Sequence, residues 1–293
     1  MKIIKATYGN RDCTEIIQSR VKDNKLQIQA TNSIVGDPQV GVVKYLQVEG
    51  EIDGNPFSES VREGDLLVVP KTNKDRIGIF YSNNNTPQIF PAIRASLESI
   101  RIAAEGKADI YTCMWNREPE NPFIEYISWN KNSSHLNQLL QIMQLLYSAR
   151  QVHQYKYVSF LEHDVLYGEG YFDYPDFEPG EVITNMNYMG MNKKGYQPLG
   201  QRDEPFHQMT MRFDDAIKHC ESILPNALVT NNGLIETQTL VRKQCTSKNP
   251  SIHINHGYHF TSHCNVYRKD GIFQKDPYWG NHDKWKYLFD ENK

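Results

Sequence analysis

The sequence predicts an α/β fold preceded by a small β-rich domain, and two patterns along the chain lead to this prediction. Residues 1–72 hold short runs of strand-forming side chains separated by turn-forming sequences. From Arg76 onwards, strand-like segments alternate with helix-like ones, which is typical of a largely parallel sheet. We therefore expect one domain over residues 1–72 and a second over residues 76–293, in a chain long enough to give each domain its own core.

The first domain is expected to consist of short strands joined by turns. The strands are expected at residues 2–8, 25–30, 41–48 and 65–69. Turns are expected at Gly36-Asp37-Pro38 and at residues 53–56, because Gly, Pro, Asp and Asn favour the backbone angles that turns require. The polar residues 71–75 are expected to link this domain to the next.

The second domain is expected to alternate strands and helices. The pattern predicts strands at residues 77–81 and 110–114, and helices at residues 88–105, 136–150 and 211–223. In the first of these helices, apolar residues recur at the helical spacing, as on the buried face of an amphipathic helix. Parallel strands would bring their carboxyl ends to one edge of the sheet, where ligands bind in such folds.

The most informative segment is an apolar strand at residues 155–161 that ends directly in Glu162, His163 and Asp164. Ionised carboxylates beside an apolar strand are costly unless they are paired or coordinated. On an extended backbone, Glu162 and Asp164 would share one side, with His163 on the other. Two carboxylates on one side suit a divalent cation, although a strand that simply ends in a solvated loop would also produce this pattern.

Two motifs in the second half of the chain resemble one enzyme family. Residues 162–167 read EHDVLY, and residues 251–261 read SIHINHGYHFT, with Trp279-Gly280 further on. Together they resemble a subset of the nucleotide-sugar glycosyltransferases of the GT-A class, over about residues 76 to 290. The resemblance implies a Rossmann-related mixed, mostly parallel sheet. It also implies transfer of a sugar from a nucleoside diphosphate sugar, for which we expect a UDP-sugar, to an acceptor hydroxyl.

The resemblance implies a role for several residues. The expected ligands of Mn²⁺ or Mg²⁺ are Glu162, Asp164 and His256. Such a cation would stabilise the charge on the departing diphosphate. The residues expected to bind the donor nucleotide follow strands, and they are Tyr81, Ser82, Asn83, Trp115 and His163. Trp115 would serve equally well as packing at the rim.

Three residues between the acidic motif and the following helix are candidates for catalysis: Asp203, Glu204 and His207. If the transfer inverts the sugar, one of them would accept the proton of the acceptor hydroxyl. Acidic residues near a helix start are also expected from the helix dipole alone. The residues 253–263 hold four histidines, but their spacing lacks the paired ligands of a structural zinc site.

The acceptor is predicted from weaker patterns. Residues 185–196 are rich in Met, Asn and Tyr and would form an amphipathic wall beside the donor, with basic residues nearby that could follow a phosphate backbone. Some glycosyltransferases of this kind resemble viral enzymes that modify hydroxymethylated pyrimidines in DNA, including by transfer of arabinose. A surface polysaccharide or a lipid-linked oligosaccharide is the alternative acceptor. A metal-dependent nucleotide-sugar phosphohydrolase and a non-catalytic binding protein are alternatives of other classes.

Composition sets further limits. The net charge of −3 argues against a general attraction to nucleic acid, although it allows a local basic groove. No apolar run reaches the length of a membrane span, and no signal peptide opens the sequence, so we expect a cytoplasmic protein, in the host cytoplasm if it is viral. The five cysteines are scattered and are expected to be reduced, buried thiols.

Overall fold

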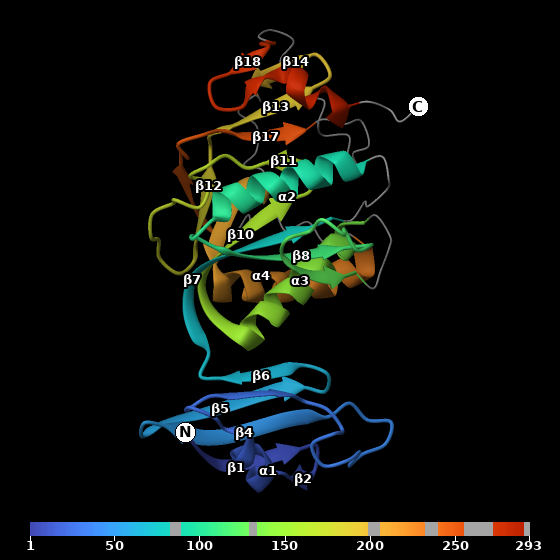
Figure 1. Cartoon of the computed structure of the whole chain (residues 1–293), viewed down its shortest axis with the longest axis vertical. Helices are drawn as coiled ribbons and strands as arrows, with labels where there is room; N and C mark the ends of the chain where they lie inside the picture. The colour runs from blue at the N-terminus through green and yellow to red at the C-terminus, as the bar shows by residue number, and fades with distance from the viewer. Residues whose placement is uncertain (83–88, 129–133, 199–205, 232–239, 255–271, 290–293) are drawn as a thin grey trace. The chain divides into compact units, whose positions relative to one another are not determined.

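The structure is a computed structural model of the whole chain, and it describes residues 1–82, 89–128, 134–198, 206–231, 240–254 and 272–289. The chain divides into two compact units. One comprises Met1–Lys74 with Tyr147–Gln154, and the other comprises Asp75–Leu146 with Tyr155–Lys293. Figure 1 shows their elements coloured along the chain. Within the described residues, no helix is both long enough and apolar enough to cross a membrane.

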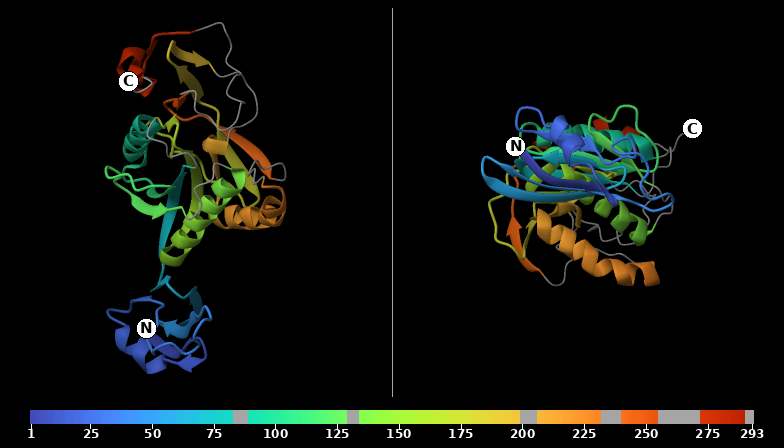
Figure 2. Two further views of the ribbon diagram at one scale, coloured as in Figure 1. Left: turned by 90° about the vertical axis from the view of Figure 1, so that its right-hand side faces the viewer. Right: turned by 90° about the horizontal axis from the view of Figure 1, so that it is seen from below.

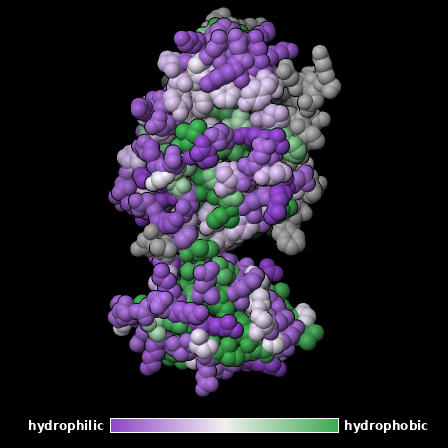
Figure 3. All heavy atoms as spheres, in the orientation of Figure 1, coloured by the Kyte–Doolittle hydropathy of each residue, from purple (hydrophilic) through white to green (hydrophobic). Residues whose placement is uncertain are grey.

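The first unit is built mainly from two small antiparallel sheets. Their strands and one helix are β1 (Lys2–Tyr8), β2 (Arg11–Asp12), α1 (Thr14–Arg20), β3 (Leu26–Gln29), β4 (Tyr45–Ile52), β5 (Asn55–Arg62) and β6 (Leu66–Val69). One sheet has the order β2-β1-β4-β5, and the other pairs β3 with β6. Alternate residues of these strands point inwards and form one apolar core, which includes Tyr8, Ile17, Leu26, Leu46 and Leu67. Figure 3 shows apolar side chains (green) among polar ones on the visible face of this unit.

Three local predictions for the first unit were wrong. The helix α1 was not anticipated, and the strand expected at residues 41–48 begins only at Tyr45. Residues 53–56 were expected to form a turn, but the turn is confined to Asp53-Gly54 and β5 begins at Asn55. Pro56 is tolerated there because β5 is an edge strand, where a missing N–H breaks no ladder.

The second unit has a mixed α/β fold around one large sheet. The elements that build this sheet and cover it are β7 (Thr72–Tyr81), α2 (Phe90–Ala104), β8 (Asp109–Met114), β9 (Ile124–Ile127), α3 (His135–Val152), β10 (His153–Glu162), β12 (Glu181–Asn185), β15 (Met209–Arg212), α4 (Phe213–Thr230) and β16 (Val241–Cys245). Seven strands take the order β16-β12-β15-β10-β7-β8-β9. The sheet is mostly parallel, and β15 runs antiparallel to both β10 and β12. Figure 2 shows the sheet with its helices from two further sides.

A second, smaller sheet lies beyond β10 in the sequence. Its strands are β11 (Val165–Leu166), β13 (Tyr188–Asn192), β14 (Gly195–Pro198) and β17 (Ser251–Ile254), in the order β11-β17-β13-β14. A short two-stranded sheet, β18 (Lys275–Asp276) with β19 (Gly280–Asn281), and the 3₁₀ helix η4 (His282–Leu288) follow. Their apolar side chains, among them Trp279 and Leu288, pack with Leu166, Met191 and Ile252 in one core cluster.

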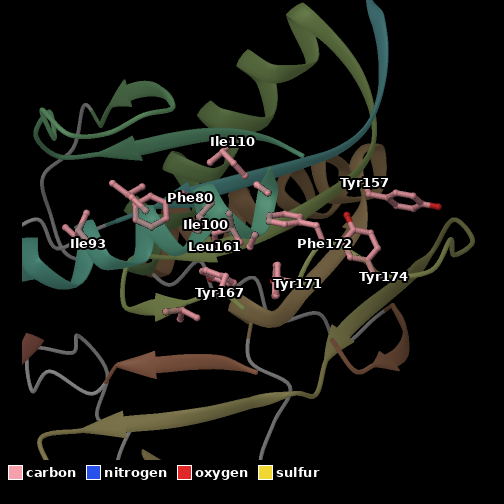
Figure 4. Close-up of a cluster of buried hydrophobic side chains, with 14 of the residues drawn as sticks. Phe80, Ile93, Ile100, Ile110, Tyr157, Leu161, Tyr167, Tyr171, Phe172 and Tyr174 are labelled. Carbon is pink, nitrogen blue, oxygen red and sulfur yellow. The ribbon is translucent and has the colours of Figure 1, made fainter. Parts of the chain in front are cut away.

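The main core of the second unit lies between α2 and the large sheet. Figure 4 shows Phe80, Ile93, Ile100, Ile110 and Leu161 directed into this layer, with the ring of Phe172 beside them. All six side chains are buried. The apolar positions expected on one face of α2, among them Ile93, Leu97 and Ile100, are all buried, so the predicted amphipathic pattern is confirmed.

Two predictions near the start and middle of the second unit need correction. The residues 71–75 were expected to link the two domains, and the boundary between the units does fall between Lys74 and Asp75, but this segment is part of a strand, because β7 begins at Thr72 and continues to Tyr81. A helix was expected from residue 211, but Met209–Arg212 forms β15 and α4 begins at Phe213. The cause is burial, because Met211 faces Val158 and Val182 across the ladder and is fully covered. Cys13, Cys113 and Cys220 are buried and Cys245 is half-buried, and among the described cysteines all are free thiols.

Candidate functional site

The candidate site lies where the order of the strands in the large sheet reverses. From β7 the chain adds β8 and β9 on one side, and it then returns through α3 to place β10 on the other side of β7. Ligands of open α/β sheets bind outside the carboxyl ends of the strands at such a reversal. Tyr81 is the last residue of β7, and Glu162 is the last residue of β10.

Glu162 receives two hydrogen bonds on its carboxylate. The Tyr81 hydroxyl donates to Oε1 at 2.7 Å, and Nδ1 of His207 lies 3.2 Å from Oε2. Burial raises the pKa of Glu162, but the hydrogen bond and the charge of His207 outweigh it and hold that pKa below its usual value. Burial, reinforced by the Glu162 charge, raises the pKa of Tyr81 well above its ordinary value. Tyr81 therefore remains a protonated donor, and Glu162 remains an acceptor.

Asp164 contacts a histidine from the smaller sheet. The backbone turns at His163 and Asp164, so the alternation assumed for an extended chain stops at Glu162. Beyond the turn, β11 pairs with β17, and Val165 lies opposite His253. This pairing brings Nε2 of His253 to 3.3 Å from Oδ2 of Asp164, whose side chain is only 8% exposed.

The two carboxylate–histidine pairs belong to one cluster. The rings of His207 and His253 are stacked, with centroids 5.2 Å apart and planes 27° apart. Asp164 is close enough to raise the pKa of Glu162 through its charge. We call Glu162, Asp164, His207 and His253 the acid–histidine cluster.

The position of His207 follows from the reversed direction of β15. Residues that follow a parallel strand reach the carboxyl edge of the sheet, but β15 is antiparallel to β10, so the residues that precede β15 reach that same edge. His207 lies in the 3₁₀ turn η2 (Phe206–Gln208) directly before β15. Its carbonyl oxygen accepts a hydrogen bond from the Tyr171 hydroxyl at 3.1 Å, which helps to hold the turn in place.

Side chains of α2 hold the turn that carries Asp164. The Ser96 hydroxyl lies 2.6 Å from the Val165 carbonyl oxygen and 3.2 Å from that of Glu162. The Ser99 hydroxyl accepts a hydrogen bond from the main-chain N–H of Tyr167. Because both serines are buried on a regular helix, they give the turn a rigid support.

The acid–histidine cluster has the right donor types for a divalent cation. Within the described ranges, no three His, Cys, Asp or Glu side chains converge as ligands of one ion. Carboxylate and imidazole donors together nevertheless suit Mn²⁺ or a similar cation. The N···O separation of 3.3 Å between His253 and Asp164 is close to the spacing of about 3 Å between adjacent ligands of an octahedral ion with bonds of about 2.1 Å. Nε2 of His207 is buried and, among the described residues, has no hydrogen-bond partner.

The other predicted site residues are distributed as follows. Ser82 is buried directly after Tyr81, and Trp115 is half-buried directly after β8. His163 is half-buried in the turn between Glu162 and Asp164. Four predicted residues lie outside the described residues, and they are Asn83, Asp203, Glu204 and His256. His253 was not predicted as a ligand, and the only sequence signal for it is its place in a strand-like stretch beside His256.

The amphipathic wall expected at residues 185–196 is only partly at the surface, because residues 186–189 are half-buried and Lys193 and Lys194 are exposed while most of the other side chains are covered. Met191 and Tyr196 are fully buried in the smaller sheet, and Asn185 is 3% exposed. The Asn185 side-chain amide instead bonds Gln208 and Ser247. The apolar alternation in this segment belongs to β13 and β14, so it marks a core rather than a stacking surface.

Comparison with known proteins does not assign the chain to a family. No model of a protein family matches the chain, and no curated protein matches it significantly. The functional argument therefore rests on the fold and on the acid–histidine cluster.

Proposed function

We propose that this protein is a divalent-metal-dependent glycosyltransferase with a GT-A-like second unit, which moves a sugar from a nucleoside diphosphate sugar to an acceptor hydroxyl. The observation that carries the proposal is the acid–histidine cluster at the strand-order reversal between β7 and β10. Its place suits a nucleotide, and its side chains suit the cation that accompanies a diphosphate. The resemblance of residues 162–167 to the EHDVLY element of such enzymes supports the same reading.

Asp164, Glu162 and His253 would hold the cation, with His256 as a further ligand implied by the resemblance. When bound, the cation supplies positive charge that stabilises the departing diphosphate. Tyr81, which is itself buried, orients Glu162 by donating to Oε1. The Ser96 hydroxyl keeps the turn in place beneath Asp164.

His207 is the best-placed described residue for proton transfer. Its Nδ1 faces Glu162, which fixes the ring, while Nε2 has no hydrogen-bond partner among the described residues. A base that is oriented by a carboxylate through one nitrogen and takes a proton through the other is a common catalytic arrangement. In an inverting reaction, Nε2 of His207 would accept the proton of the acceptor hydroxyl.

For the acceptor, the proposal is a hydroxymethylated pyrimidine in DNA. With Met191 and Tyr196 of the Met- and Tyr-rich segment buried, the support for this acceptor is narrower and comes mainly from basic side chains. Arg242 and Lys243 on β16, and Lys248 after it, are exposed. Lys243 pairs with Glu181 at 2.7 Å, so Lys248 carries most of the case for a phosphate backbone. The alternative acceptor is a surface polysaccharide or a lipid-linked oligosaccharide.

The test is thermal unfolding of the full chain with a panel of nucleotide sugars, each with and without Mn²⁺. We expect one nucleotide sugar to raise the unfolding temperature only when the metal is present, because a ligand of the folded state at 100 times its Kd adds about 2.7 kcal/mol. Asp164→Asn should remove that shift and lower turnover by more than about 100-fold, since even outer-shell partners of a metal cost 10- to 100-fold. The matched control is Glu105→Gln, which changes an exposed carboxylate just after α2.

Turnover assays separate the proposal from its alternatives. Transfer to hydroxymethylcytosine DNA, or to an oligosaccharide acceptor, should exceed hydrolysis of the donor. Hydrolysis at an equal rate without an acceptor would instead indicate a phosphohydrolase. Stabilisation by the metal alone, with no nucleotide effect and with Asp164→Asn unfolding the chain, would indicate a structural metal in a binding protein.

A further inference from the structure

A second group of buried polar side chains lies beside the acid–histidine cluster, at the ends of β7 and β9. Ser82 follows β7, Ser128 follows β9, and Asn137 and Gln141 lie on the first half of α3. Ser82, Asn137 and Gln141 are between 0% and 1% exposed. None of these side chains is charged, so the group is chemically different from the neighbouring cluster.

Hydrogen bonds and helix spacing fix how the three most buried side chains are arranged. Nε2 of Gln141 donates to the Ser82 carbonyl oxygen at 2.9 Å, which directs Oε1 of Gln141 elsewhere. The Ser82 N–H donates to the Cys113 carbonyl oxygen at 3.1 Å, which ties Ser82 to the end of β8. Asn137 precedes Gln141 by four residues, so the two amides are neighbours on one face of the helix. Gln141 therefore lies between Ser82 and Asn137.

One polar atom of each of these residues has no hydrogen-bond partner within the described parts of the chain. The three atoms are Oγ of Ser82, Oε1 of Gln141 and Nδ2 of Asn137. The Asn137 amide is oriented by Ser128, whose hydroxyl lies 3.3 Å from Oδ1. Buried polar atoms without a partner are uncommon in folded proteins, and three together indicate a place where another molecule completes the bonding.

Together the three atoms form a pattern of hydrogen-bond donors and acceptors that a ligand could match. Nδ2 of Asn137 is a donor, Oε1 of Gln141 is an acceptor, and the Ser82 hydroxyl can donate. The imide edge of uracil has the complementary order, because N3–H is a donor between the O2 and O4 acceptors. Cytosine has an acceptor at N3, and the purines present other orders. A site with this pattern would therefore prefer uracil.

We propose that Ser82, Gln141 and Asn137 read the uracil base of the donor nucleotide. This inference rests on the proposed function, and it assigns specificity to two residues of α3. Ser82 directly follows Tyr81, whose hydroxyl bonds Glu162, so a nucleotide with its base here would direct its diphosphate towards the acid–histidine cluster. All three atoms are buried. The entering base must displace the atoms that cover them, and it is then read out of contact with water.

The first test leaves the protein unchanged and varies the ligand. Calorimetric titration of the full chain with Mn²⁺ would compare UDP, CDP, GDP and N3-methyl-UDP. We expect UDP to bind at least 10-fold more tightly than the other three. CDP lacks the central donor that Gln141 accepts, N3-methyl-UDP blocks it, and guanine places an amino donor where uracil has its O2 acceptor. Binding of UDP and N3-methyl-UDP within twofold of each other would overturn the uracil assignment and leave the proposed function intact. If no nucleotide binds, the proposed function fails as well.

A substitution provides the second test. Asn137→Asp exchanges a donor for an acceptor, which suits the amino group of cytosine, so the ratio of UDP to CDP affinity should fall at least 10-fold. The matched control is Gln144→Leu on the same helix, where Gln144 accepts a weak hydrogen bond from the Cys113 thiol. That control should keep the ratio of the unchanged protein. An equal ratio in both variants would contradict the proposal, and if Asn137→Asp does not fold, the N3-methyl comparison decides.

Discussion

Two buried groups of charges, one in each unit, are built in opposite ways. In the first unit the Lys44 ammonium lies 2.9 Å from Asp37 and 3.2 Å from Glu63, and it also contacts the carbonyl oxygens of Gln39 and Val42. In the second unit, the two carboxylates of the acid–histidine cluster each face one imidazole at more than 3 Å. A charge enclosed by partners on every side has nothing left for a ligand, whereas Nε2 of His207 in the acid–histidine cluster has no hydrogen-bond partner among the described residues.

The difference also lies in where the partners come from. Asp37, Gln39 and Val42 belong to the same short segment as Lys44, so the ammonium closes a local loop. The acid–histidine cluster draws its members from the ends of β10, η2, β11 and β17, which are up to 91 residues apart in sequence. A local group can serve the folding of its own loop. A group assembled from four distant elements is costly to form, and this is typical of sites that bind or react.

Removal of the Lys44 charge should have the largest effect on stability. Lys44→Met would leave Asp37 and Glu63, whose side chains are 32% and 26% exposed, without their common cation. It would also leave the carbonyl oxygens of Gln39 and Val42 without the donor that the buried ammonium supplies, and an acceptor that loses its donor inside the protein is costly. We expect the midpoint of thermal unfolding of the first unit to fall by roughly 10 °C. Circular dichroism would follow it, with Lys25→Met as the control at an exposed lysine. Equal effects of the two substitutions would show that the Lys44 contacts are not important for stability.

The same group should make stability depend on acid pH. The hydrogen bond from Lys44 holds the pKa of Asp37 below its usual value, and for Glu63 the contacts with Lys44 and Tyr8 outweigh the opposing effect of burial. Carboxyl groups with a lowered pKa stabilise the folded state above their ordinary pKa and lose that effect as the pH falls through the lowered value. The unchanged protein should have a higher free energy of unfolding than Lys44→Met, and this difference should be constant near neutrality and shrink below about pH 4.5. Urea unfolding from pH 3 to 7 measures the difference, and a difference that persists at pH 3 would contradict the assignment.

Replacement of a histidine in the second unit should have the smallest effect on stability. His207→Phe keeps a ring against His253 and removes the unpartnered Nε2, while Glu162, whose side chain is 24% exposed, can exchange the lost contact for water. We expect the unfolding temperature to change by less than about 5 °C. Turnover and the joint effect of metal and nucleotide should be reduced much more. A fall in stability as large as that of Lys44→Met would indicate that the acid–histidine cluster is structural.

The sequence predicted the elements whose signals are local. The apolar spacing in α2 and the apolar run of β10 depend only on neighbouring residues, and both were found close to their true bounds. The start of β5 was missed because Asn55-Pro56 favours a turn locally and only its edge position permits a strand. Met211 and Arg212 were assigned to a helix because the strand partners of Met211, Val158 and Val182, are distant in sequence and leave no local signal.

In the candidate site, too, the residues with a local sequence signal could be predicted and the contacts that depend on distant strand pairing could not. Glu162 and Asp164 could be identified because charges at the tip of an apolar strand are visible in one segment. The contact of Asp164 with His253 depends on the pairing of β11 with β17, which no local pattern specifies. His207 was predicted as a catalytic candidate, but its contact with Glu162 depends on the reversed direction of β15.

The reversed direction of β15 has a consequence for how this protein can vary. The two ends of β15 lie at opposite edges of the sheet, so a change just before Met209 reaches the acid–histidine cluster while a change after Arg212 reaches α4. Insertions or substitutions ahead of this strand could alter the chemistry while the sheet keeps its pairing. In a library of variants, residues 206–208 are therefore the segment in which to search for new activity without loss of the fold.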